Sequence, residues 1–100
     1  MNLKIRLLAI LYELLGFLET HKVNYASAIK RIVKTLEPII DHEELQQAIK
    51  DSRRQLLGGM GSLNDVWITK ENGHVVDDEK AANRRLEEYR EKLRRILVQE

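Results

Sequence analysis

Residues 3–20 are apolar at most positions. The polar or small residues within and beside this stretch recur at alternating steps of four and three. These residues are Asn2, Arg6, Ala9, Glu13, Gly16 and Thr20. A helix with one narrow polar stripe buries most of its circumference. The pattern therefore predicts a helix over 3–20 at the centre of a helical bundle, with Leu8, Leu11 and Leu15 in the core. Gly16 predicts close approach by a neighbouring element, and the alternative is a tolerated glycine that faces solvent.

Two further helices are predicted by apolar residues spaced three and four positions apart. The first of these begins at Asn24, a favourable N-cap residue, and ends at Pro38. The next begins at Asp41, which can cap the first turn and has Glu44 three residues on, as in a capping box. It stops at Gly58, because glycine commonly ends a helix.

Between residues 58 and 78, helical spacing gives way to short apolar runs and glycines. Residues 66–69 and 74–76 have strand character, and Asn72-Gly73 between them is a strong hairpin signal. Helical spacing resumes near Asp77 or Asp78 and continues towards the C-terminus. The predicted fold class is mainly α, a bundle of about four helices with a small β-hairpin inserted before the C-terminal helix. We expect one domain over residues 1–100.

Composition favours a folded chain and a cytoplasmic location. The chain is 43% apolar and 33% charged, carries a formal net charge of +1 and has no cysteine, so disulfides and thiolate chemistry are excluded. Lys4 and Arg6 precede an apolar run as in a signal peptide, but Glu13 interrupts that run and no small-residue cleavage site follows. We expect a soluble cytoplasmic protein with no membrane association.

Motifs for chemistry are incomplete throughout the chain. His42-Glu43 begins like a zinc-protease signature, but Gln46 stands where the second histidine is required. The glycines after residue 57 follow a helix C-terminus, whose carbonyls repel phosphate. Ser62 lacks the glycine frame of a nucleophile elbow. We therefore expect no catalytic residue, no metal ligand, no cofactor and no enzyme activity.

The glycine-rich segment 59–65 is the most specific feature of the sequence. It combines residues tolerant of unusual backbone angles with side chains that bond locally to the backbone. The favoured interpretation is a structural loop, and its predicted structural residues are Gly59, Gly61, Ser62, Asn64 and Asp65. The alternative is a recognition loop in which Trp67 is an exposed binding anchor.

This segment resembles a group of small bacterial proteins without established biochemistry. The shared features are a G-M-G-S-x-N-D core over residues 59–65, a short apolar strand at 66–68, an N-G turn at 72–73 and a leucine-rich helix from about Glu79. The resemblance covers about the last 45 residues and implies a related fold. By size and class, the chain is also similar to immunity partners of bacterial toxins.

Two functions from different classes follow from these patterns. The first is a small protein-binding inhibitor, an immunity protein that neutralises a cognate nuclease-type toxin domain. Its candidate partner-binding residues are Glu37 and Glu43, from an acidic stretch suited to a basic surface, and Trp67. The alternative is a nucleic-acid-associated regulator that uses the Arg-rich segment 84–95, although interleaved acidic residues make nucleic acid the less favoured partner.

Overall fold

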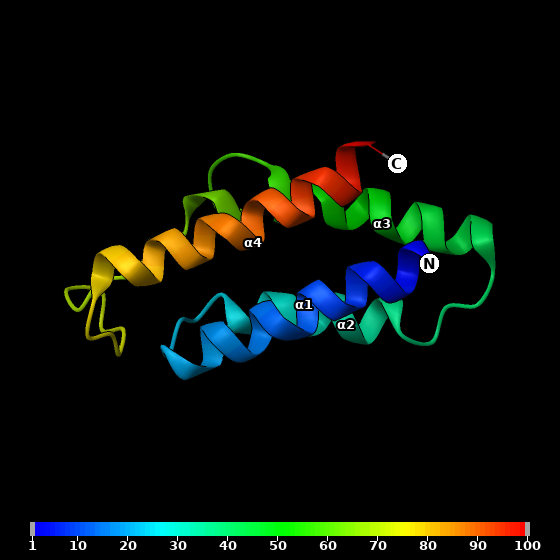
Figure 1. Cartoon of the computed structure of the whole chain (residues 1–100). Coiled ribbons are helices and arrows are strands. Elements are labelled where there is room, and N and C mark those ends of the chain that lie inside the picture. The colour runs from blue at the N-terminus through cyan, green and yellow to red at the C-terminus, as the bar shows by residue number, and fades with distance from the viewer. Residues whose placement is uncertain (1, 100) are drawn as a thin grey trace.

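The computed structural model describes residues 2–99 and is built almost entirely of helices. The α-helices are α1 (Leu3–Thr20), α2 (Ala26–Leu36), α3 (His42–Leu57) and α4 (Glu79–Gln99), with one 3₁₀ turn, η1 (Leu63–Asp65). Consecutive α-helices run in opposite directions, and a long connection that includes η1 joins α3 to α4 (Figure 1). The predicted mainly helical bundle of four helices is confirmed. No helix over residues 2–99 has both the length and the apolar character needed to cross a membrane.

The core side of α1 differs in part from the predicted one. Its fully buried leucines form one stripe at helical spacing, which consists of Leu7, Leu11, Leu14 and Leu18. Leu8 and Leu15 are only partly buried beside that stripe. Ile5 and Tyr12 are 57% and 47% exposed. The prediction therefore holds for Leu11 and needs correction for Leu8 and Leu15, because α1 has an exposed apolar flank.

Gly16 faces solvent, and a Cβ added there would meet no atom within 4 Å. The favoured prediction of close approach by a neighbouring element is therefore wrong, and the alternative, a glycine that faces solvent, is observed. The central placement of α1 is also wrong, because a helix at the centre of the bundle would not leave this side uncovered.

The observed helix ends agree with some of the predicted capping residues and differ from others. Asp41 is the N-cap of α3, and its carboxylate accepts from the Glu44 backbone N–H at 2.9 Å, as predicted. Asn24 is not the N-cap of α2, which begins at Ala26 without a side-chain cap. Gly58 ends α3 in an extended conformation, and a Cβ there would lie 2.3 Å from the Arg54 carbonyl oxygen. Glycine is therefore required at position 58, because the Arg54 carbonyl lies too close to admit a side chain.

The predicted β-hairpin is wrong: residues 2–99 contain no strand. The chain does reverse between Thr69 and His74, whose backbone N–H donates to the Thr69 carbonyl at 3.2 Å. However, the two arms do not pair with each other, because helices satisfy their backbone groups. The Asn83 side chain of α4 bonds both the N–H and the C=O of Ile68, each at 2.8 Å. The Val75 N–H donates to the backbone carbonyl of His21, just after α1, at 2.9 Å, and the Val75 carbonyl lies 2.6 Å from the His21 ring nitrogen Nδ1.

The turn itself gives a direct prediction at Gly73, whose φ is +84°. Replacement of Gly73 by valine should destabilise the fold by about 1–2 kcal/mol, because a β-branched residue resists positive φ. Gly73→Asn should cost less, since asparagine tolerates this region. The melting temperatures of both variants measure the effect, and an unchanged Gly73→Val protein would contradict the turn geometry.

Candidate functional site

The predicted partner-binding residues lie in two separate regions. Glu37 and Glu43 are exposed and flank the loop between α2 and α3. Trp67 belongs to the connection between η1 and α4, and Figure 1 shows this connection towards the opposite end from the α2–α3 loop, in a molecule whose longest extent is 42 Å. The structure therefore does not bring the three residues into one site.

Glu37 already has contacts within the fold. A hydrogen bond to the Glu37 carboxylate raises the pKa of the Tyr12 hydroxyl above its usual value. The Lys4 ammonium donates to the backbone carbonyls of Glu37 and Ile39, at 2.7 and 2.5 Å. This places a cation at the C-terminal end of α2, where the helix dipole favours it. Glu37 thus helps to hold α1 against the end of α2.

The Tyr12–Glu37 contact predicts a pH effect at the alkaline end. Because folding raises the pKa of Tyr12, the contribution of this bond to stability is fully present below the unfolded pKa, about 10. It is lost as the pH rises through the higher folded pKa. Glu37→Ala should lower the pKa of Tyr12, measured by the NMR shifts of its ring. Tyr25, whose hydroxyl donates to the Gln55 carbonyl, serves as the internal control.

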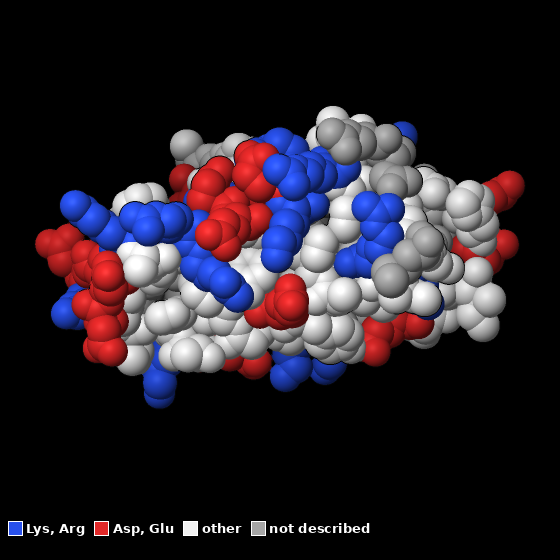
Figure 2. Space-filling view, viewed as in Figure 1, with Lys and Arg blue, Asp and Glu red and all other residues white. Residues whose placement is uncertain are grey.

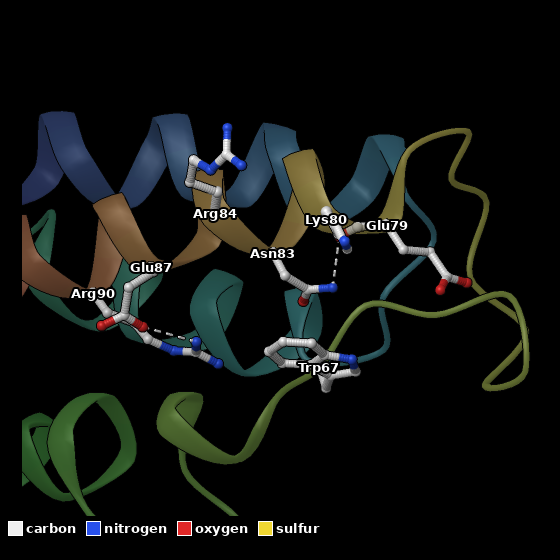
Figure 3. A pocket seen from close by; sticks show the side chains of 7 residues that line it. All are labelled: Trp67, Glu79, Lys80, Asn83, Arg84, Glu87 and Arg90. Carbon is white, nitrogen blue, oxygen red and sulfur yellow. Dashed lines mark hydrogen bonds and ion pairs between the residues drawn. The ribbon is translucent and has the colours of Figure 1, made fainter.

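Trp67 borders an open groove of about 520 Å³, whose other lining residues come from the first half of α4. The indole is 58% exposed. The lining residues are Trp67, Glu79, Lys80, Asn83, Arg84, Glu87 and Arg90. Figure 3 shows Trp67 on the loop side and Lys80 and Arg84 on α4, with the Arg84 side chain directed away from the indole at the outer rim.

Two buried polar side chains of α4 hold the Trp67 segment in place. Asn83, 5% exposed, bonds both backbone groups of Ile68, the residue that follows Trp67. Arg90, 6% exposed, donates to the Leu63 carbonyl at 3.0 and 3.2 Å and also to the Val66 carbonyl. Because these bonds fix the backbone on both sides of Trp67, the indole is presented on an ordered segment.

Both acidic residues of the groove make contacts within the fold. Glu79 accepts from the Lys70 backbone N–H at 2.8 Å. Glu87 pairs with Arg90 at 3.1 Å (Figure 3). Within the described part of the chain, the side chains of Lys80 and Arg84 have no hydrogen bond or ion pair. The charged side chains of the groove without a partner are therefore both cationic.

The glycine-rich loop forms its own hydrogen-bond set. The Ser62 hydroxyl donates to the Gly59 carbonyl at 2.6 Å and accepts from the Asn64 N–H at 3.2 Å. The Asn64 amide donates to the last carbonyls of α3. Asp65 accepts from the N–H of Gly61, whose φ is +82°. These contacts support a structural role for the loop, which stays a prediction until variants are tested.

The Arg-rich face of α4 is divided by internal contacts. Arg90 is buried, Arg85 lies 3.9 Å from Glu88, and Arg94 is paired with Glu91. In Figure 2 the Lys and Arg side chains of this helix alternate with acidic ones and do not form one continuous basic patch. Over residues 2–99, no three His, Asp or Glu side chains gather in a group that could hold a metal ion.

Sequence reasoning missed Asn83, Lys80 and Arg84 as parts of the site. Asn83 had a visible signal, because it is a polar residue next to Ala82 on the apolar side of the last helix. Lys80 and Arg84 are one helical turn apart and therefore share a face. Their proximity to Trp67 had no sequence signal, since it depends on how the loop 58–78 folds back on α4.

Comparison with known proteins assigns the chain to a family. A family model described as a domain of unknown function, DUF6966, matches residues 19–77. The matched region includes α2, α3 and the segment that carries Trp67. No curated protein and no solved structure matches the chain. Because the family model covers more than half of the residues, the chain belongs to the DUF6966 family.

Proposed function

We propose that this protein is a binding inhibitor of the immunity-protein kind, which occludes a cognate toxin domain in the bacterial cytoplasm without performing chemistry itself. The observation that carries the proposal is Trp67, an exposed tryptophan on an ordered segment beside a groove. Tryptophan is enriched at the centres of protein interfaces because it buries a large area with few rotatable bonds. An ordered anchor also loses little conformational entropy on binding.

The nucleic-acid alternative has less support from the same surface. Binding to a phosphate backbone needs several Lys or Arg side chains that have no partner within the protein and that are spaced to meet successive phosphates. Arg90 is occupied by loop carbonyls, and Arg85 and Arg94 face carboxylates of their own helix. Trp67 is also the single tryptophan in the chain and the one aromatic residue among those that line the groove. Sequence-tolerant binding of single strands uses successive stacking platforms.

If the partner is a nuclease-type toxin, the acidic residues at the α2–α3 end of the molecule would attract its basic surface. Glu43 is exposed there, and Glu37 is close to it in the chain. A basic toxin surface would be steered towards these carboxylates, so charge reversal at both positions should slow association more than it speeds dissociation. Stopped-flow or biosensor rates at low salt measure this. An unchanged association rate would restrict the interface to the Trp67 face.

The functional test is protection of cells from a toxin. The protein is co-expressed with the C-terminal domain encoded by the gene immediately upstream, and growth and co-purification are measured. The proposal expects growth with the wild-type protein, loss of protection with Trp67→Ala, and protection by the control Ile5→Ala, which alters an exposed apolar residue of α1. Failure of the wild-type protein both to protect and to co-purify would contradict the proposal.

A further inference from the structure

We propose that the Trp67 groove accepts an extended acidic segment of a partner protein, with the side-chain pattern acidic–apolar–acidic. This inference rests on the proposed binding function and adds the chemistry of the segment that is bound. It is carried by the charge of the groove, by the spacing of two cations on α4 and by the indole opposite them.

The charge of the groove favours carboxylates. Both acidic residues that line it are held by internal contacts, Glu87 by the Arg90 guanidinium and Glu79 by a backbone N–H that leaves its charge in place. Over residues 2–99 the side chains of Lys80 and Arg84 have no hydrogen bond or ion pair, and both residues are exposed. The lining carries three cationic and two acidic side chains, so a basic segment would meet a net positive charge, whereas an acidic segment could pair with Lys80 and Arg84.

The spacing along α4 specifies which acidic pattern fits. Lys80 and Arg84 are four residues apart, which corresponds to about 6 Å along a helix that rises 1.5 Å per residue. Alternate residues of an extended chain are separated by about 6.6 Å, and they point to the same side. Two carboxylates at positions i and i+2 of an extended segment therefore match the two cations at the rim.

The residue between the two carboxylates then points away from α4. Trp67 lies on the loop side of the groove, across from α4 (Figure 3). An apolar side chain at this middle position would cover part of the exposed indole and remove apolar surface from water. A segment such as Glu-Leu-Glu therefore combines two rim ion pairs with one central apolar contact.

Fluorescence of the single tryptophan reports occupancy of the groove directly. The probes are four synthetic ligands: a peptide with a central Glu-Leu-Glu, its Lys-Leu-Lys counterpart, a scrambled peptide with Glu-Glu-Leu, and an oligothymidylate. We expect a saturable blue shift with Glu-Leu-Glu, weaker binding of the scrambled peptide, and no saturable change with Lys-Leu-Lys. Exposed ion pairs are individually weak, so the difference between the first two should be roughly fivefold.

Charge reversal provides the decisive control. The double variant Lys80→Glu and Arg84→Glu should lose the response to Glu-Leu-Glu and gain one to Lys-Leu-Lys. The matched control is Lys30→Glu with Lys34→Glu, an exposed pair with the same spacing on α2, and it should bind like the wild type. Melting curves confirm that each variant is folded.

The contrary results are equally specific. Equal responses to the acidic and basic peptides, or retained Glu-Leu-Glu binding in the Lys80/Arg84 variant, would overturn the inference. A response to oligothymidylate alone would assign the groove to single-stranded nucleic acid instead. Because no toxin is used, this assay can fail while the cell-protection test succeeds, and the reverse also holds. The two proposals are therefore separable.

Discussion

Replacement of Leu11 by alanine is expected to lower the free energy of unfolding by about 2–5 kcal/mol. Leu11 is fully buried in the middle of the leucine stripe of α1, which packs on α2 and α4. The substitution removes one methine and two methyl carbons and leaves a cavity that the surrounding helices fill only in part. For a chain of this size, such a loss is a large fraction of total stability. Urea denaturation measures it.

Two control variants test whether the loss of stability follows the burial of each side chain along α1. Leu8→Ala should cost clearly less than Leu11→Ala, because Leu8 is only partly buried. Ile5→Ala should be close to neutral, since its side chain is 57% exposed. If all three variants had similar denaturation midpoints, the exposed flank of α1 would have to be covered in solution, and the described core would be incomplete.

Replacement of Asn83 by leucine is expected to be the most damaging change near the groove. The variant leaves the N–H and C=O of Ile68 without their partners. A buried backbone group that loses its hydrogen bond costs about 1–3 kcal/mol. Because Ile68 follows Trp67 directly, the fluorescence of Trp67 should also change. Chemical denaturation and the emission spectrum of the folded state measure the two effects.

The variant Asn83→Asp separates the two halves of this interaction. Aspartate retains an acceptor for the Ile68 N–H, but it cannot donate to the carbonyls of Ile68 and Glu79. Its stability should fall below that of the wild-type protein because a carboxylate faces two carbonyl oxygens. Asn24→Ala, at an exposed position, should be near neutral. Wild-type stability in Asn83→Leu would refute the bridging role of Asn83.

The helices were predictable because their signals are local. Apolar spacing identified all four, and the Asp41 cap was identified from its own side chain and Glu44. The buried side of α1 was less well predicted, because leucine occupies both its core side and its flanks. Which leucines are buried depends on where α2 and α4 lie, and the α1 sequence alone does not contain that information.

The hairpin failed for a tertiary reason. Asn72-Gly73 does form a turn, and Gly73 has the positive φ expected of it. Strand pairing was lost because Asn83 and His21 supply the hydrogen bonds that a neighbouring strand would have made. The same tertiary hydrogen bonds position Trp67 beside α4. The groove and its unpaired cationic side chains therefore could not be predicted from the spacing of residues in the sequence.

The affinity of Trp67→Ala for the co-purified toxin domain, measured by titration calorimetry, tests the central proposal most directly. A central tryptophan of an interface contributes about 2 kcal/mol or more, so the dissociation constant should rise roughly 30-fold or more. The control Ile5→Ala, at an exposed position of α1, should bind like the wild type, and both variants should melt cooperatively. A dissociation constant for Trp67→Ala equal to that of the wild type would contradict the proposal that this face binds the partner.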